Sequence, residues 1–315
     1  MKTRRLGRTG LQVSEVVLGA GYVGGLFVLA DDDTRLRVLR RALDAGINWI
    51  DTAPLYGQGR SEEALGWLLA DIPDKPCLST KVRPDFGKPD LRGQIERSVH
   101  ESLKRLRRDS VDLLQLHNPI DGSNVAQVLG EAVDALERVR AQGLARFIGL
   151  TALGQAGAIV QALDSGRFDT AQVYYNLLNP SAARAMPAGW TGHDFSGVVA
   201  ACKRHDVGIM NIRVFAAGVL ATDARHGREV VATEHSELDT EQRRAHAALA
   251  ALGSGHGTRA QTALRFSLAN PDLACVVIGL AEHSHLEEAV AAQAMGPLPA
   301  DAIARLEAVY GKDFS

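Results

Sequence analysis

The sequence predicts an α/β fold, a single (β/α)8 TIM barrel with an N-terminal β-hairpin. Eight short β-rich runs alternate with amphipathic helical stretches, which is the pattern of parallel βαβ units. Eight units favour closure into a barrel over an open sheet. The 315 residues also suit one domain, since such barrels commonly exceed about 250 residues. We therefore expect residues 1–315 to form a single domain.

Each expected element follows from its composition and its boundaries. Residues 1–15 contain a Gly-Arg-Thr-Gly turn between two short runs, which predicts the hairpin. The expected strands are Val16–Leu18, Asn48–Ile50, Cys77–Thr80, Val111–Leu116, Phe147–Leu150, Ala171–Tyr174, Gly208–Ile212 and Cys275–Ile278. The expected helices are Thr34–Ala45, Ser61–Ala70, Leu91–Arg107, Val125–Gln142, Gln155–Ser165, Ser196–His205 and Arg259–Leu268. Glycines at several helix ends are typical of C-caps.

The first βα turn leaves an alternative fold open. Gly19, Gly21 and Gly24 form Gly-x-Gly-x-x-Gly after the first strand, and the next strand ends at Asp51. This spacing is near that of a dinucleotide-binding fingerprint. The fingerprint requires a helix to open at once, whereas residues 26–33 intervene before the next expected helix. The barrel is therefore the favoured interpretation.

Three expected loops are longer than barrel closure requires. They are Gly21–Asp33, Asn179–Asp194 and Ala221–Glu241. Long loops at the carboxyl ends of barrel strands build the pocket. Because Tyr22 and Trp190 are aromatic residues of the first two loops, we expect both to line a substrate pocket.

The segment at residues 46–62 contains several residues suited to catalysis. An apolar strand ends in Asp51, and the following loop presents Tyr56 beside glycines that free the backbone. Ser61 is expected to cap the next helix, with Glu62 in the first turn, where the helix dipole favours negative charge.

Strand parity brings polar side chains of three neighbouring units together. Side chains alternate along a strand, so Lys81 shares a face with Ser79, and His117 shares one with Gln115. If these faces point inward, ionisable side chains from strands two, three and four, beginning with Asp51, converge at one end of the barrel.

This convergence predicts proton transfer to or from a carbonyl oxygen. An ammonium group near a phenol favours the phenolate, and a carboxylate keeps that ammonium charged and oriented. Tyr56 would therefore act as general acid or base, with Lys81 and Asp51 tuning it and His117 polarising the same oxygen. None of these side chains carries hydride, so a cofactor must supply it. Each residue alone is more often structural, and the joint placement supports the catalytic interpretation.

The stretch from Gly46 to Glu62 resembles the signature of the aldo-keto reductases, with Asp-Thr-Ala, Tyr-Gly and Ser-Glu in order. The resemblance continues in Ser-Thr-Lys at 79–81 and Leu-Gln-Leu-His at 114–117, and covers nearly the whole chain. It implies the catalytic tetrad Asp51, Tyr56, Lys81 and His117. It also implies a nicotinamide dinucleotide lying across the barrel mouth.

The resemblance further implies a set of cofactor contacts. The matching positions are Thr151, Gln172, Ile212, Arg213, Phe215, Gly279, Ala281, His285 and Glu288. Gln172 matches the glutamine that contacts the carboxamide group. Ala152 and Ala289 stand where the family usually has asparagine, and Ile212 stands where it often has an aromatic ring. These departures indicate a less typical branch of the family.

The choice between NADP and NAD depends on cations near the adenine ribose. No Arg or Lys lies between Gly279 and Glu288, which alone favours NAD or weak discrimination. Arg213, Arg225 and Arg228, after the seventh strand, would supply positive charge if that loop folds over the cofactor. The resemblance favours NADP. We expect NADP as the working cofactor, with NAD possible.

The expected function is an NAD(P)(H)-dependent oxidoreductase that interconverts an aldehyde or ketone and an alcohol. A sugar (aldose) dehydrogenase is the alternative within the family. A barrel that binds nucleotide without turnover, as a regulatory subunit, and a metal-dependent hydrolase are alternatives outside it. Only Asp51 and His117 suit a metal cluster at the strand ends, so we expect no metal.

The composition of the chain limits the kinds of partner and the location that we expect. A net charge of −2 and a pI of about 6.6 give no sign of a nucleic-acid partner. No long apolar run predicts a membrane span, and the N-terminal residues lack the apolar core of a signal peptide. The three cysteines have neither metal nor redox spacing, so a cytoplasmic location is expected. The expected ligand is a small carbonyl compound or sugar, and the oligomeric state stays open.

Overall fold

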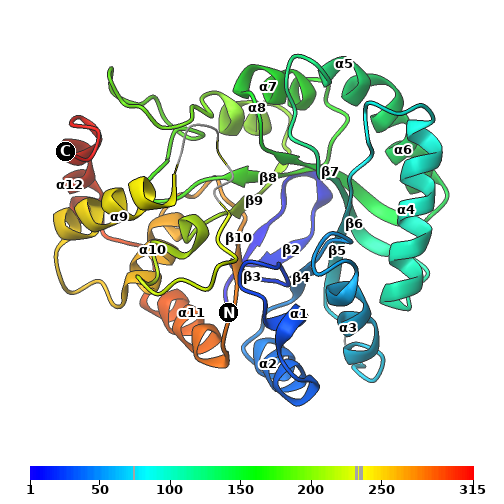
Figure 1. Cartoon of the computed structure of the whole chain (residues 1–315), viewed down its shortest axis with the longest axis horizontal. Coiled ribbons are helices and arrows are strands. Elements are labelled where there is room, and N and C mark those ends of the chain that lie inside the picture. Colours follow the sequence, from blue (N-terminus) through cyan, green and yellow to red (C-terminus); the bar gives the residue numbers. More distant parts are fainter. Residues whose placement is uncertain (74, 231–232, 234–236) are drawn as a thin grey trace.

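The computed structural model describes residues 1–73, 75–230, 233 and 237–315 of the chain. Its centre is a closed barrel of parallel strands in the order β10-β3-β4-β5-β6-β7-β8-β9 (Figure 1). The strands are β3 (Val16–Gly19), β4 (Trp49–Asp51), β5 (Cys77–Val82), β6 (Val111–Leu116), β7 (Ala145–Ala152), β8 (Thr170–Tyr174), β9 (Gly208–Ile212) and β10 (Cys275–Gly279). Strands that follow one another along the chain are neighbours, and the predicted (β/α)8 barrel is confirmed.

Helices surround this barrel, as Figure 1 shows. Each strand of the barrel is followed by one of the helices of a first group. These helices are α2 (Asp32–Asp44), α3 (Arg60–Leu68), α4 (Leu91–Leu106), α6 (Val133–Ala141), α7 (Ala156–Asp164), α8 (Val198–Arg204), α10 (Arg259–Leu268) and α11 (His283–Met295). Further helices are α1 (Leu26–Leu29), α5 (Val125–Gln127), α9 (Leu238–Leu252) and α12 (Ala300–Tyr310). The core lies between helices and strands: α2, for example, buries Val38, Leu39 and Ala42 there. Burying a large apolar side chain contributes about 1.5–3 kcal/mol.

The predicted N-terminal hairpin covers one end of the barrel. β1 (Thr3–Arg5) pairs antiparallel with β2 (Gln12–Ser14). Leu6 and Val13 from the hairpin join Cys275, the first residue of β10, in one buried apolar cluster. The hairpin therefore closes the end at which the strands begin.

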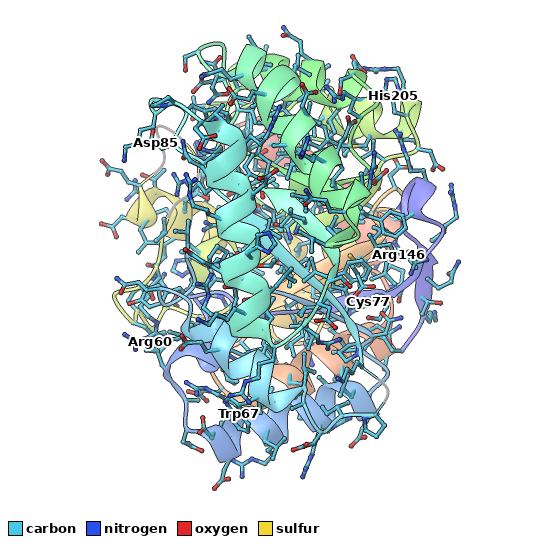
Figure 2. The ribbon with its side chains drawn as sticks, turned by 90° about the vertical axis from the view of Figure 1, so that its right-hand side faces the viewer. Arg60, Trp67, Cys77, Asp85, Arg146 and His205 are labelled. Atoms are coloured by element: carbon cyan, nitrogen blue, oxygen red, sulfur yellow. The ribbon has the colours of Figure 1, made fainter. Side chains whose placement is uncertain are left out.

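Figure 2 shows the two ends of the barrel on opposite sides of the view. Cys77, the first residue of β5, and Arg146, near the start of β7, lie towards the edge beside the hairpin. Asp85, just beyond β5, and Arg60, the first residue of α3, lie towards the opposite edge. The carboxyl ends of the strands therefore face the end that the hairpin leaves open, which is where barrels of this kind build their sites.

The helix expected over Val125–Gln142 is divided. A π-helical turn at Val128–Ala132 separates α5 from α6, and Gly130 within it has φ −102° and ψ −106°. Glycine has no Cβ and adopts this irregular conformation at low cost. Because the apolar residues on both sides keep helical spacing, the sequence pattern alone did not reveal the interruption.

Two of the long expected loops contain regular structure. The short helix α1 lies within Gly21–Asp33, and α9 begins at Leu238, inside the loop expected to end at Glu241. The parts of that expectation at residues 231–232 and 234–236 lie outside the described residues.

The glycines of the first βα turn have a packing role. A Cβ atom on Gly19 would lie 2.8 Å from the carbonyl oxygen of Ile278, and one on Gly24 would lie 2.6 Å from the backbone of Leu280. β3 pairs with β10 where the barrel closes, and only glycine permits such a close approach. The Gly-x-Gly-x-x-Gly sequence therefore reflects barrel closure, and the dinucleotide-fingerprint alternative is wrong.

Candidate active site

The loop after β4 holds Tyr56 at the open end of the barrel. The amide of Tyr56 donates to Ala53 O (3.1 Å), and its carbonyl accepts from the amide of Ser61 (3.3 Å). Gly57 has φ +63°, and a Cβ there would lie 2.4 Å from a methyl group of Val28. A glycine at this position is therefore needed for the loop to pack against α1 and to fix the tyrosine.

Ser61 does not cap α3 as expected. The N-cap is Gly59, whose φ is +92°, and it makes no side-chain capping bond. The Ser61 hydroxyl instead donates to Ala20 O (2.9 Å) and lies 2.8 Å from the hydroxyl of Thr52. This serine therefore ties the start of α3 to the ends of β3 and β4.

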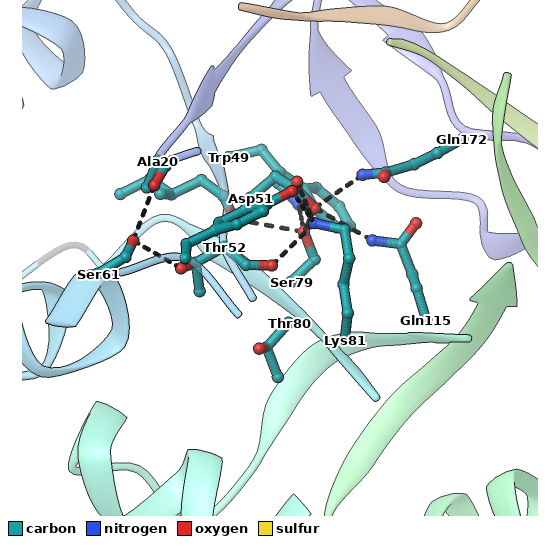
Figure 3. Close-up of polar contacts among 12 residues, drawn as sticks. Ala20, Trp49, Asp51, Thr52, Ser61, Ser79, Thr80, Lys81, Gln115 and Gln172 are labelled. Atoms are coloured by element: carbon teal, nitrogen blue, oxygen red, sulfur yellow. Dashed lines mark hydrogen bonds and ion pairs between the residues drawn. The ribbon is translucent and has the colours of Figure 1, made fainter. Parts of the chain in front are cut away.

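Asp51 and Lys81 form a buried ion pair at the carboxyl ends of β4 and β5 (Figure 3). Lys81 Nζ donates to Asp51 Oδ2 (2.5 Å), to Thr52 O (2.8 Å) and to the hydroxyl oxygen of Tyr56 (3.2 Å). An ammonium group has three protons, so all three have acceptors. Because Tyr56 accepts from Lys81, its own proton is free to face the barrel mouth.

The ionisation of Lys81 depends on this pairing. Burial alone would lower the pKa of Lys81, but the Asp51 carboxylate and the Tyr56 phenol outweigh it, so the pKa lies above its usual value. The lysine is fully buried and remains an ammonium at neutral pH. Tyr56 is therefore always next to a positive charge, 4.8 Å from the centre of its ring.

Asp51 has donors that the sequence analysis did not assign. Its Oδ1 accepts from the Ser79 hydroxyl (2.7 Å), from Gln115 Nε2 (3.1 Å) and from Gln172 Nε2 (2.8 Å). All three side chains are buried. They come from β5, β6 and β8, so Gln172 reaches Asp51 across the inside of the barrel (Figure 3). Strand parity is the signal that identifies Ser79 and Gln115, since both share the inward face of a predicted catalytic residue. Several donors to one carboxylate fix its position.

His117 directly follows β6 and lies across from Tyr56. The two ring centroids are 6.0 Å apart and the rings are nearly perpendicular. The amide of His117 donates to Val82 O (2.8 Å), which fixes the imidazole beside the end of β5. Burial, followed by the positive charges of Lys81, Arg83 and Arg213, lowers the pKa of His117 to about 3. The imidazole is therefore neutral at physiological pH.

The lowered pKa of His117 predicts acid sensitivity. An unfolded histidine takes up a proton near pH 6.5, whereas His117 in the folded protein does so only near pH 3. Stability should therefore fall as the pH drops from 6.5 towards 3, by up to about 1.4 kcal/mol per pH unit. Urea unfolding at pH 7 and pH 4.5 measures this loss, and it should be smaller in His117→Gln. An equal loss in both proteins would contradict the assignment.

The residues expected at the nicotinamide end lie on β7 and β8. Thr151 pairs with Gln172 across these strands. The Thr151 hydroxyl is buried and has no hydrogen-bond partner in the described part of the chain, so it can receive a ligand group. The amide nitrogen of Gln172 is already used by Asp51. Ala152 is fully buried, so the asparagine amide usual at this position has no counterpart.

The segment after β9 is strained. Arg213, Ala216 and Ala217 have positive φ values of 63°, 45° and 57°, which cost of order 1–3 kcal/mol each in residues with a side chain. Ile212 and Phe215, the other cofactor positions expected here, are partly buried. Arg213 O accepts from Asn176 Nδ2 (3.0 Å). Strain of this kind is typical of ligand clamps.

The third expected group lies after β10. Gly279 is exposed, Ala281 and Glu288 are partly buried, and the amide of Ala281 lies 3.3 Å from Nδ1 of His285. α11 has no side-chain cap at Glu282, so amide groups of its first turn have no side-chain acceptor there. A helix N-terminus of this type suits a phosphate group.

Arg228 reaches this end of the barrel from the loop after β9. Its Nη2 lies 3.5 Å from Gly24 O, and its Nε is buried with no hydrogen-bond partner among the described residues. A Cβ on Gly24 would contact the backbone of Leu280, so Arg228 is near the carboxyl end of β10. Arg225 instead bonds to Gln242 Oε1 (2.6 Å). Arg228 is therefore the loop cation placed nearest the expected phosphate site.

The two residues expected in the substrate pocket lie on loops at the open end. Tyr22 is 45% exposed, and its neighbour Gly21 lies beside the Tyr56 ring. Trp190 packs over Gly192, and no described residue forms a hydrogen bond with its buried Nε1. Thr191 fastens this loop to the C-terminal segment through Asp313 Oδ2 (2.6 Å).

Metal clusters and membrane-spanning helices are both absent from the described residues. In the described ranges, no three His, Cys, Asp or Glu side chains lie close enough together to hold a metal ion. No helix among these residues is both long and apolar enough to cross a membrane.

A buried lysine that joins a carboxylate to a tyrosine, at the mouth of a barrel, is the arrangement expected of a carbonyl oxidoreductase. A model of the Aldo/keto reductase family matches residues 15–311. The chain is 30% identical over 301 residues to L-galactose dehydrogenase of Arabidopsis thaliana, covering 93% of this chain and 88% of the relative. It is 33% identical over 302 residues to D-threo-aldose 1-dehydrogenase of a Pseudomonas species, covering 86% of each.

Solved structures agree with these relatives. An aldo-keto reductase from Bacillus halodurans, in its holo form, superimposes over the whole of both chains with a TM-score of 0.75 and 24% identity, which supports the fold. An aldo-keto reductase from Klebsiella pneumoniae in complex with NADPH has a TM-score of 0.71 and 25% identity, covering 98% of this chain and 95% of that chain. The chain belongs to the Aldo/keto reductase family, and the predicted class of enzyme, an NAD(P)-dependent oxidoreductase, is confirmed.

Proposed function

We propose that this enzyme interconverts a small carbonyl compound or sugar and the corresponding alcohol or oxidised sugar, with Tyr56 as general acid and base. The observation that supports this most directly is the position of Lys81 Nζ, which donates to both Asp51 and Tyr56. The lysine holds the phenol oxygen, and the phenol proton remains available to a substrate oxygen. Tyr56 donates this proton during reduction and removes one during oxidation.

His117 completes the oxyanion site in this proposal. A neutral imidazole carries one N–H and donates it to the same carbonyl oxygen without competing for the proton that Tyr56 supplies. Lys81 contributes positive charge close to the developing oxyanion, and burial strengthens that interaction. Asp51, with its four donors, keeps this charge in place.

The nicotinamide dinucleotide supplies the hydride when bound, and residues of this chain fit such a group. Thr151 and Gln172 would hold the nicotinamide end, although Gln172 must share its amide with Asp51. The strained segment with Ile212, Arg213 and Phe215 would lie along the cofactor. The residues after β10, from Gly279 and Ala281 to His285 and Glu288, would hold the adenosine phosphates, and Arg228 would contact the 2′-phosphate of NADP.

The cofactor proposal predicts a modest preference for NADP. A charge-assisted contact from Arg228 to the 2′-phosphate contributes on the order of 1.5–3 kcal/mol, which corresponds to roughly 10- to 10²-fold discrimination. NAD should therefore still support measurable turnover. Comparing kcat/KM for the two cofactors tests the preference, and Arg228→Gln should lower it while leaving NADH binding unchanged. A clear preference of the wild type for NAD would overturn this proposal.

The substrate and direction follow from an assay with both cofactors in both directions. The named relatives include two sugar dehydrogenases, so aldoses belong in the panel beside simple aldehydes. We propose that Tyr22 and Trp190 contact the substrate, and that the protein functions in the cytoplasm. Oxidation of NADPH by an aldehyde, or reduction of NADP by an aldose, would support the proposed enzymatic function. Nucleotide binding without turnover on any compound would favour a regulatory role.

A further inference from the structure

Arg83 is a cation at the barrel mouth that the contacts above do not use. It directly follows β5, two residues beyond Lys81 and four beyond Ser79. Both of those side chains point into the barrel, where they contact Asp51. Side chains alternate along an extended chain, so the continuation of β5 directs Arg83 towards the same opening.

The backbone around Arg83 is fixed next to His117. Val82 O accepts from the amide of His117 (2.8 Å), and Pro84 O accepts from Asn118 Nδ2 (2.8 Å). Arg83 therefore stands between two hydrogen bonds to the segment that carries the imidazole. Asp85, two residues further on, lies towards the open edge of the barrel (Figure 2).

Arg83 is exposed and unpaired within the described part of the chain. The nearest acidic residue along the chain, Asp85, lies 3.5 Å from Lys88. The charges that act on the imidazole of His117 are all positive and come from Lys81, Arg83 and Arg213. A cleft lined by one sign of charge attracts ligands of the other sign.

The place of Arg83 in the barrel separates it from the expected cofactor phosphates. β5 lies opposite β9 in the closed order of strands. The cations and amides that suit the phosphates follow β9 and β10, whereas Arg83 lies on the side that carries Tyr56 and His117. A substrate with its carbonyl oxygen between Tyr56 and His117 would extend past Arg83.

We propose that Arg83 binds a carboxylate of the substrate, so that the preferred substrates are small aldehydes or ketones that also carry a carboxylate group. This inference rests on the proposed function of the same site. A guanidinium group matches a carboxylate with two parallel hydrogen bonds, which fixes orientation as well as affinity. Anchoring the far end of the substrate positions its carbonyl group against Tyr56. The carboxylate itself is unchanged by the reaction.

Two substrates that differ only by an ester methyl group, and by the charge that it removes, test this proposal. Reduction of 4-carboxybenzaldehyde and of its uncharged methyl ester, methyl 4-formylbenzoate, is followed with NADPH in the wild type, Arg83→Gln and Arg83→Lys. The wild type should show about 10-fold or greater kcat/KM for the acid, the scale of one charge-assisted contact. Arg83→Gln should remove this preference and change the ester less than about twofold, and Arg83→Lys should retain part of it.

Arg40→Gln is the matched control, since Arg40 is an exposed arginine on α2 at the outer surface. Like Arg83→Gln, this substitution removes one positive charge, and the variant should keep the preference for the acid over the ester. Equal rates for acid and ester in the wild type would overturn the inference, as would a preference that survives in Arg83→Gln. Activity on the ester without an acid preference contradicts only this inference, whereas inactivity on every carbonyl compound and sugar contradicts the proposed function.

Discussion

Replacing Tyr56 with phenylalanine should lower kcat by about 10²-fold or more, which is the scale of a lost general acid. The substitution removes only the hydroxyl that accepts from Lys81 (3.2 Å) and leaves the ring beside His117. The fold and the cofactor residues should therefore be unaffected. The rate of NADPH oxidation with a saturating aldehyde measures turnover, and fluorescence titration with NADPH measures cofactor binding.

Tyr22→Phe provides the control for this experiment, since it keeps the aromatic ring that we propose contacts the substrate. Tyr22 is an exposed tyrosine on the neighbouring loop, so removing its hydroxyl changes the same atoms without touching Lys81. This variant should keep turnover within a few-fold of the wild type. If Tyr56→Phe also turned over at the wild-type rate, Tyr56 would not be the proton donor.

The ends of the barrel strands were the part of the site best predicted from sequence. Alternation along the strands grouped Asp51 and Lys81 with the predicted site, and in the structure Lys81 contacts both Asp51 and Tyr56. The alternation of side chains between the two faces of a strand is imposed by its backbone and does not depend on distant residues. The same rule grouped Ser79 and Gln115 with this site, but only the closed barrel shows that both donate to Asp51.

Loop and cap residues were predicted less well because their contacts come from elsewhere in the chain. Ser61 has the composition of an N-cap, yet its hydroxyl bonds to Ala20 and Thr52. The position of Arg228 beside Gly24 depends on how a loop after β9 folds over the first βα loop. No local pattern encodes either contact, since each joins segments distant in sequence.

Replacing Lys81 with methionine should affect turnover and stability together. Methionine fills a similar volume but leaves the Asp51 carboxylate, which is 3% exposed, without its opposing charge. Breaking a buried ion pair by removing one partner costs about 3–5 kcal/mol. The pKa of Lys81 is raised in the folded protein, so the pair stabilises the wild type below the ordinary lysine pKa and is lost only as the pH rises through the higher folded value. Urea unfolding at pH 7 therefore measures its full contribution.

Loss of the ammonium group should also lower turnover. Lys81 Nζ holds the phenol oxygen of Tyr56 and supplies positive charge beside the developing oxyanion, so kcat at pH 7 should fall by roughly 10²-fold or more. The double variant Asp51→Asn with Lys81→Met removes both charges and should recover most of the stability, while turnover stays low. This separates catalysis from folding. Wild-type turnover in a folded Lys81→Met protein would show that Lys81 does not assist the tyrosine.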